Sequence, residues 1–257
     1  MKLITSRDNP YFKELLKLSS SAKARRDAGK TLLDGAHLLA AYLDSGLLPR
    51  HILLHSTALQ DAEIAALLAR LETVPTTQLD DKLYAELSEL KTPSGVLALV
   101  DIIRPVNRNA HFSLLLEDIQ DPGNLGSILR TAAAAGCDAT FLSASCADVW
   151  SPKVLRAAMG GHFCLHIHER QNLLEVAQSY GGATFAASLH ATRSLYGCEL
   201  RGPVAFMVGN EGAGLSDELL ARATHKITIP MPGKVESLNA AAATAICLFE
   251  AVRQRSV

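Results

Sequence analysis

The sequence has few aromatic residues and almost no charge imbalance. Aromatic residues make up 5% of the 257 residues, with a single Trp, and the formal net charge is −1 from 25 basic and 26 acidic residues. A protein that stacks many bases of a single strand would carry more aromatic residues. A globally basic nucleic-acid binder would carry a large positive charge. The composition argues against both classes.

Long apolar runs and paired cysteines are also lacking. No run approaches the roughly twenty residues of a membrane-spanning helix, and Thr5 turns the N-terminus polar too early for a signal peptide. The five cysteines show no CxxC spacing, which favours reduced thiols in a cytoplasmic protein. Because 48% of the residues are hydrophobic, the chain can bury a core and is expected to be soluble, with no membrane partner.

Familiar ligand signatures are missing as well. There is no P-loop, and Gly209–Gly212 lacks the spacing of a dinucleotide-binding loop. His166 and His168 would share one face of a strand, but no third ligand has zinc-site spacing, so we predict no metal.

Charge is distributed unevenly along the chain. Residues 1–31 carry eight basic and three acidic residues, whereas residues 56–90 are mostly acidic. A basic arm of this kind predicts contacts with nucleic-acid phosphates. The candidates are Arg7, Lys23, Arg25 and Arg26. The alternative interpretation is a solvated amphipathic helix.

The pattern of apolar residues predicts two domains. Residues 1–103 read as a small α/β domain, residues 104–110 as a polar linker containing Pro105, and residues 111–257 as a second α/β domain. In the first domain we expect helices over 10–18, 37–45, 61–71 and 80–89, and strands over 31–34, 51–55 and 96–100.

Strand-like and helix-like segments alternate in the second domain, which predicts a parallel sheet covered by helices. Ligands of such a sheet bind beyond the carboxyl ends of the strands. We expect strands over 113–117, 139–142, 164–167, 184–188, 204–208 and 226–229. The expected helices are 126–135, 152–159, 173–180, 215–223 and 238–253.

Three segments of the second domain combine glycines with small polar residues between a strand-like and a helix-like run. They are Asp121–Thr131, Gly209–Ser216 and Ile229–Asn239. Backbone can approach a ligand closely at such turns and present its N–H groups, and Gly209 and Gly212 would permit that approach to a cofactor. Three of them in one domain indicate a composite site.

Taken alone, the polar residues of these segments have ordinary structural readings. Asn124 and Ser237 are both suited to capping a helix N-terminus. Arg130 reads as a surface arginine or a phosphate contact, and Glu211 as an acceptor for backbone amides or a partner for an arginine.

The ordered set resembles the three motifs of the SpoU (TrmH-like) branch of the SPOUT RNA methyltransferases, from about Ser113 to Arg255. Residues 1–103 are more loosely similar to the ribosomal-protein-L30-like substrate-binding domain of these enzymes, through residues 6–10, 33–39 and 92–98. The resemblance implies a trefoil knot at the C-terminus and a homodimer. The small side chains of residues 240–245 suit tight threading, or simply a good helix former.

The resemblance also assigns residues by position. It implies catalytic roles for Asn124, Arg130, Glu211, Ser237 and Asn239, with Arg130 also contacting RNA. It implies S-adenosylmethionine binding by Ser188, Leu189, Gly209, Asn210, Gly212, Ile229, Met231 and Leu238. The run Ala240–Ala243 departs from the Val-Ser-Val-Ala-type stretch of many members, which affects packing more than activity.

The implied activity is S-adenosylmethionine-dependent methylation of a ribose 2′-hydroxyl in structured RNA, with ribosomal RNA ranked above transfer RNA. The family proposal makes Arg130 the base, whereas the chemistry of a guanidinium favours a cation that stabilises charge; both readings stay open. The alternatives are a transfer-RNA enzyme, a catalytically silent RNA-binding protein, and a methyltransferase for a base or a small molecule.

Overall fold

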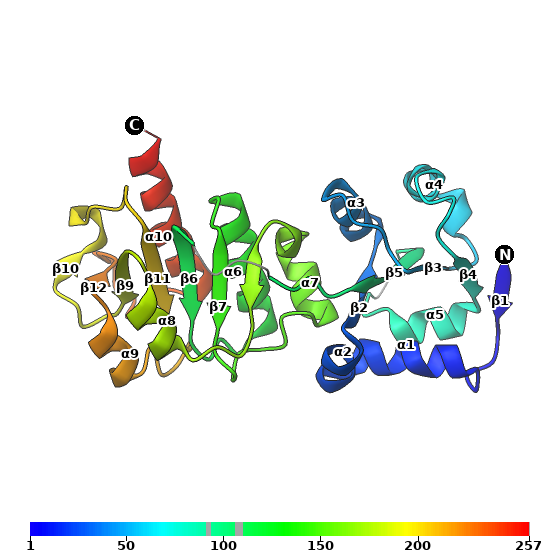
Figure 1. The fold of residues 1–257 in the computed structure, drawn as a ribbon, viewed down its shortest axis with the longest axis horizontal. Coiled ribbons are helices and arrows are strands. Elements are labelled where there is room, and N and C mark those ends of the chain that lie inside the picture. The colour runs from blue at the N-terminus through cyan, green and yellow to red at the C-terminus, as the bar shows by residue number, and fades with distance from the viewer. Residues whose placement is uncertain (91–93, 106–109, 257) are drawn as a thin grey trace. The chain divides into compact units, whose positions relative to one another are not determined.

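The computed structural model describes residues 1–90, 94–105 and 110–256. They form two compact units: Met1–Ile103 with Trp150–Phe163, and Arg104–Val149 with Cys164–Val257 (Figure 1). Residues 106–109 of the predicted linker, and residues 92 and 93 of the segment 92–98, lie outside the described residues.

Unit 1 contains a mixed five-stranded sheet between two helical layers. The order is β1-β4-β3-β5-β2, with β5 antiparallel to both of its neighbours and the other pairs parallel. Helices α1 and α5 cover one face, and α3 and α4 cover the other (Figure 1). The strands are β1 (Lys2–Ile4), β2 (Lys30–Asp34), β3 (His51–Leu54), β4 (Thr76–Leu79) and β5 (Val96–Asp101). The helices are α1 (Pro10–Ser20), α2 (Ala22–Ala28), α3 (Ala36–Asp44), α4 (Ala62–Ala69) and α5 (Asp81–Leu87).

Local sequence explains how α1 begins and what it buries. The Asn9 side chain accepts hydrogen bonds from the N–H groups of Tyr11 and Phe12, at 2.9 and 3.3 Å. Pro10 occupies the first turn, where a missing N–H costs nothing. Phe12, Leu15 and Leu18 then recur at helical spacing and are buried against the sheet.

A segment from the second half of the chain belongs to unit 1. It contains α7 (Pro152–Ala158) and a 3₁₀ turn (Gly161–Phe163). The Thr31 hydroxyl donates to the Trp150 carbonyl at 2.8 Å. A Cβ on Gly160 would lie 2.7 Å from the Ala41 Cβ, so glycine permits close packing there.

Unit 2 contains a seven-stranded sheet in the order β10-β12-β9-β11-β6-β7-β8, in which every neighbouring pair is parallel. The strands are β6 (Phe112–Leu116), β7 (Ala139–Leu142), β8 (His166–His168), β9 (Ala183–Ala187), β10 (Arg193–Ser194), β11 (Val204–Val208) and β12 (His225–Thr228). This arrangement confirms the predicted parallel α/β sheet.

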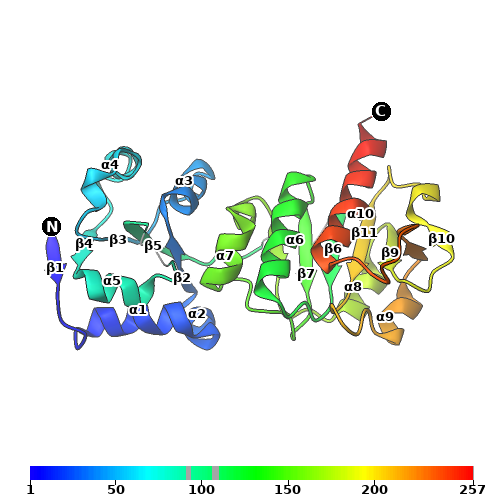
Figure 2. The same ribbon diagram turned by 180° about the vertical axis from the view of Figure 1, so that it is seen from behind.

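Helices cover both faces of this sheet. Helix α6 (Pro122–Ala134) packs against α10 (Ala240–Arg255) on one face, and α8 (Leu173–Ser179) packs against α9 (Asp217–Arg222) on the other (Figures 1 and 2). Because side chains alternate along a strand, Leu115 and Met207 fill the core beneath α8 and α9. None of the helices in the described ranges is long and apolar enough to span a membrane.

The structure differs from the sequence prediction at short or polar elements. Strand β1 has three residues, and β4 buries only alternate positions of a Thr-Thr-Gln-Leu run, so neither stood out as apolar. Helix α2 and the two-residue β10 were missed for similar reasons. Strand β8 begins at His166 rather than at residue 164.

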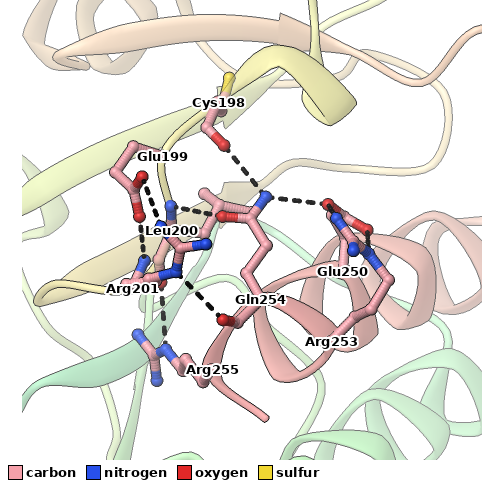
Figure 3. Close-up of polar contacts among 8 residues, drawn as sticks. All are labelled: Cys198, Glu199, Leu200, Arg201, Glu250, Arg253, Gln254 and Arg255. Carbon is pink, nitrogen blue, oxygen red and sulfur yellow. Dashed lines mark hydrogen bonds and ion pairs between the residues drawn. The ribbon is translucent and has the colours of Figure 1, made fainter. Parts of the chain in front are cut away.

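Figure 3 shows a polar cluster that fastens the end of α10 to the loop before β11. The buried Gln254 amide donates to the Cys198 carbonyl at 3.0 Å and to Glu250 at 2.8 Å, and accepts from the Leu200 N–H at 3.0 Å. Two hydrogen bonds from Arg253 hold the Glu250 carboxylate and lower its pKa to about 2. The last turn of α10 is thereby fixed to the unit.

The turn before β9 gives a matched test of packing. A Cβ on Gly182 would overlap the Pro203 carbonyl, which accepts the Ala183 N–H at 3.0 Å, whereas no described atom lies within 4 Å of a Cβ on Gly181. Gly182→Ala is expected to cost about 1–3 kcal/mol, and each kcal/mol corresponds to about 2–4 °C in Tm for a chain of this size. Gly181→Ala is expected to leave Tm nearly unchanged, and thermal unfolding measures both. Equal Tm values for the two variants would contradict this account of the turn.

Candidate functional site

The three motifs and the loop after β9 lie at the carboxyl edge of the unit 2 sheet. Asp121–Asn124 follows β6, the Glu211 turn follows β11, and Ile229 follows β12. From β6 the chain builds β7 and β8 on one side, while β11 and β9 occupy the other side. Strands β6 and β11 therefore flank the point where the winding reverses, which is where open parallel sheets form ligand crevices.

A hydrogen-bonded relay joins one residue from each motif. The Asn239 amide nitrogen donates to Asn124 Oδ1 at 2.8 Å, and the Asn124 amide nitrogen donates to Glu211 Oε1 at 2.9 Å. Asn239 and Asn124 are 115 positions apart in sequence, and Asn124 and Glu211 are 87 positions apart. The structure thus brings together three of the five predicted catalytic residues by direct side-chain contact.

Neither Asn124 nor Ser237 has the ordinary role of a helix cap. Asp121 caps α6 by accepting the Asn124 N–H at 2.7 Å, and Pro122 opens the helix. Asn239 caps α10 by accepting the N–H groups of Ala241 and Ala242, at 2.9 and 3.3 Å, so Ser237 lies before the cap. An Asp or Asn before a helix satisfies N–H groups that the helix cannot. Asn124 lies inside α6 instead, with its side chain free for the relay.

The two remaining predicted catalytic residues are exposed. Arg130 lies further along α6, and its guanidinium makes no hydrogen bond or ion pair with any residue that the structure describes. Ser237 lies in the exposed stretch before α10. The second carboxylate oxygen of Glu211 likewise has no partner within the described ranges. One cation and one carboxylate oxygen thus remain available to a ligand.

Gly209 and the Asn210 side-chain amide both hold the shape of the Gly209–Ser216 loop. A Cβ on Gly209 would overlap the backbone of Gly214 and Leu215, so closure of the loop requires glycine at this position. Asn210 donates to the Asp118 carbonyl at 2.9 Å and accepts from the N–H groups of Gly212 and Ala213, at 2.9 and 3.0 Å. Its side chain shapes the turn, which leaves backbone atoms for any ligand contact.

The other predicted cofactor residues lie at the ends of β9, β12 and α10. The Ser188 N–H donates to the Ile227 carbonyl at 2.9 Å, and Ile229 and Met231 are half-buried beyond β12. Leu189 is 56% exposed and Leu238 is 36% exposed. Apolar side chains displayed beside polar turns suit a ligand with a flat apolar ring and hydrogen-bonding edges, such as an adenosyl group.

The four predicted phosphate-contacting residues of the basic arm differ in exposure. Lys23 and Arg26 are exposed on α2. Arg7 is exposed and bonded to Glu86 at 2.9 Å. Arg25 is only 4% exposed, and its guanidinium donates to the carbonyls of Leu18 and Ser19, at 2.6 and 3.0 Å. The prediction of Arg25 as a phosphate contact is therefore corrected: it closes the end of α1.

His166 and His168 also lie in different environments. His168 is buried and stacks on Phe141 with ring centroids 4.7 Å apart, whereas His166 is exposed. No group of three or more His, Cys, Asp or Glu side chains in the described part of the chain is arranged to hold a metal ion.

Sequence reasoning overlooked the residues that support the relay. Asp121 had a recognisable signal, because an acidic residue followed by proline often precedes a helix. Glu117 and Asp118 had none, since their partners are Ser216 and Asn210, more than ninety positions away.

The two roles of Asn239 can be separated by substitution. Asn239→Asp keeps the capping oxygen and loses the amide that donates to Asn124, while Asn239→Ala loses both. Loss of a cap costs about 1 kcal/mol, so we expect Asn239→Ala to lower Tm and Asn239→Asp to retain it, as measured by thermal unfolding. An equal fall in Tm for both variants would mean that the relay, rather than the cap, holds the start of α10.

Comparisons with known proteins agree with this geometry. The profile of the SpoU rRNA Methylase family matches residues 111–249, and that of the MRM3-like substrate binding domain matches residues 9–98. The chain is 37% identical over 260 residues to an uncharacterised tRNA/rRNA methyltransferase of Synechocystis, covering 98% of this chain and 94% of that protein. It is 31% identical to the 23S rRNA (guanosine(2553)-2′-O)-methyltransferase RlmP of Bacillus subtilis, covering 97% of this chain and 98% of that protein.

A solved structure is similar over nearly the whole chain. The SpoU methyltransferase AviRb of Streptomyces viridochromogenes, in complex with AdoMet, has a TM-score of 0.85 at 28% identity and covers 96% of this chain and 98% of that one. The resemblance found in the three motifs is confirmed. The chain belongs to the SpoU rRNA methylase family.

Proposed function

We propose that the protein is an S-adenosylmethionine-dependent methyltransferase that methylates a ribose 2′-hydroxyl of ribosomal RNA. The observation that carries the proposal is the relay from Asn239 through Asn124 to Glu211, which joins the three family motifs at the carboxyl edge of the unit 2 sheet. Relatives named as ribosomal RNA 2′-O-methyltransferases, RlmP among them, support ribosomal over transfer RNA. The AdoMet-bound relative supports the cofactor.

The site contains two charged side chains, Arg130 and Glu211, and a frame of hydrogen-bonded residues made by Asn124, Glu211 and Asn239. S-adenosylmethionine, when bound, supplies an electrophilic methyl group. The guanidinium of Arg130 is a cation with several N–H donors, so it can hold an RNA phosphate and stabilise the negative charge that develops on the ribose oxygen. Glu211, fixed at Oε1 by Asn124, offers Oε2 to the ribose hydroxyl or to Arg130. Orientation by this frame reduces the entropy lost on reaching the transition state.

Residues 188, 189, 229, 231 and 238, with backbone of the Gly209–Gly212 turn, would hold the cofactor. Leu189 and Leu238 offer apolar surface for the adenine ring, and the turns offer backbone groups to its polar edges. Ser237 is exposed and directly precedes Leu238 and the Asn239 cap, so its hydroxyl would be available to the nucleotide.

Residues 1–103 are proposed to bind the RNA substrate, with residues 104–110 as a linker to the methyltransferase region at 111–257. The match to an MRM3-like substrate binding domain supports this role. Lys23, Arg26 and Arg7 are the exposed basic residues that would contact phosphates. We further propose, from the family resemblance, a homodimer whose C-terminal region forms a trefoil knot. The five free thiols support a cytoplasmic location.

Methyl transfer tests the activity and the role of Arg130 together. The wild-type protein, incubated with labelled S-adenosylmethionine and ribosomal RNA, is expected to label one ribose. Arg130→Ala should cut turnover by about a hundredfold or more while calorimetry still shows cofactor binding, because the cation acts mainly at the transition state. Arg130→Lys should rescue little, since it lacks the planar fork.

Arg222→Ala, which removes an exposed arginine from α9 in the same unit, is the matched control and should turn over normally. A wild-type protein that binds RNA without methylating it would overturn the enzyme in favour of a silent RNA-binding protein. Normal turnover in a folded Arg130→Ala protein would remove Arg130 from the mechanism.

Salt dependence tests the basic arm. The double variant Lys23→Glu with Arg26→Glu should weaken RNA binding and reduce the slope of log K against log salt by roughly one to two, because fewer counterions are released. Arg70→Glu with Lys82→Glu changes the same charge elsewhere in unit 1 and should leave the slope unchanged. Identical slopes for the two double variants would show that the α2 residues are a solvated face.

A further inference from the structure

The turn that carries Glu211 is held at both ends by two consecutive residues that follow the neighbouring strand, β6. Glu117 and Asp118 follow β6 directly, and β6 is the strand paired with β11. The turn leaves β11 at Gly209 and meets α9 at its cap, Ser216. No ligand role is assigned to Glu117 or Asp118 by the motifs, yet each contacts the loop that carries Glu211.

Asp118 holds the start of the turn. Its carbonyl accepts the Asn210 amide at 2.9 Å, and Asn210 Oδ1 accepts the N–H groups of Gly212 and Ala213 on the far side of Glu211. The direction of the Asp118 carbonyl therefore fixes the position of the Asn210 side-chain amide. That amide in turn fixes the backbone of the turn around Glu211.

Backbone geometry at Asp118 is unusual and is held by its own side chain. Its φ is +55°, a left-handed conformation that costs a residue other than glycine roughly 1–2 kcal/mol. The Ser143 hydroxyl donates to Asp118 Oδ1 at 2.6 Å and accepts the Asp118 N–H at 2.9 Å. Ser143 follows β7, so an anchor on the next strand keeps the Asp118 carbonyl aimed at Asn210.

Glu117 holds the end of the turn. Its two carboxylate oxygens accept the N–H and the hydroxyl of Ser216, at 2.7 and 2.8 Å. Hydrogen bonds to a charged carboxylate are stronger than those between neutral groups. Ser216 in turn caps α9 by accepting the Leu219 N–H at 3.3 Å, so the carboxylate fixes both the loop and the helix that follows.

We propose that Glu117 and Asp118 are positioning residues for the methyl-transfer reaction, acting by fixing the turn that presents Glu211. The inference rests on the proposed function for its catalytic consequence. Neither residue is assigned to the substrate or cofactor; each acts through Ser216 or Asn210. Removing Glu117 releases one end of the turn while the relay to Asn124 still contacts Glu211 Oε1.

Kinetics of Glu117 variants test the proposal. Glu117→Ala should lower kcat about tenfold and leave KM for RNA within about twofold, because both carboxylate oxygens are engaged by Ser216 and the residue is proposed to act through the turn. Glu117→Gln retains one acceptor for Ser216 and should recover part of kcat. Ser216→Ala removes the hydroxyl that donates to Glu117, so the double variant of Ser216→Ala with Glu117→Ala should lose less kcat than the product of the two single losses.

Glu175→Ala is the matched control. Glu175 accepts the Asn172 amide at 2.9 Å at the start of α8 in the same unit, and its bonded partner belongs to none of the three motifs. The Glu175→Ala variant removes a hydrogen-bonded carboxylate near a helix N-terminus and should leave kcat unchanged. A loss of kcat in Glu175→Ala equal to that in Glu117→Ala would mean a general effect on folding and would overturn the proposal.

Hydrogen exchange separates this inference from the proposed function. The N–H groups of Gly212 and Ala213 should exchange faster in Glu117→Ala and in Ser143→Ala than in the wild type, whether or not the wild type methylates RNA. Faster exchange in variants of a protein that shows no methyl transfer would support the positioning of the turn by Glu117 and Asp118. It would reject only the proposed function. Unchanged exchange together with unchanged kcat would overturn the inference.

Discussion

The Asn124 side-chain amide joins three loops that reach the site from distant parts of the chain. It combines an acceptor oxygen with a donor nitrogen, and both atoms are used: the oxygen by Asn239 and the nitrogen by Glu211. A carboxylate or an aliphatic side chain at this position could not bond in both directions. The shape of the site therefore depends on one amide group whose orientation is set by its two neighbours.

This amide can act because the sheet brings its partners within reach. All neighbouring strands of the unit 2 sheet are parallel, so the loops after β6, β11 and β12 leave at the same edge. Helix α6 carries Asn124 and packs against α10, whose cap is Asn239. The polar cluster around Gln254 fixes the opposite end of α10 (Figure 3). The cap is thus presented by a helix held at both ends.

Much of this architecture could be predicted from the chain alone. Apolar runs located β7 and β11 to the residue, and the order of the three motifs pointed to the family and to Asn124, Glu211 and Asn239. Pairings across the sheet could not be predicted in the same way, because periodicity does not show which strands become neighbours. The contacts of Glu117 and Asp118 with the loop after β11 depend on that pairing.

Errors of prediction at helix ends had a different physical origin. Several residues near each helix start can cap it, and the choice depends on where the backbone turns. Asn124 and Ser237 were suitable by residue type, but Asp121 and Asn239 stand at the turns. The burial of Arg25 depends on the corner between α1 and α2, where its long side chain folds back on the carbonyls that end α1.

The membership of Trp150–Phe163 in unit 1 means that the domains matched in the sequence and the compact units of the structure do not share their borders in this protein. The chain passes between the units after Ile103, after Val149 and after Phe163. A fragment starting at residue 104 would encode the whole matched methylase region yet lack β2, the strand that α7 contacts. A fragment ending at residue 103 would leave the Thr31 hydroxyl without the Trp150 carbonyl. A cut in the linker alone therefore leaves both pieces incomplete, and excising the methyltransferase as a module would require redesigning the surface of α7.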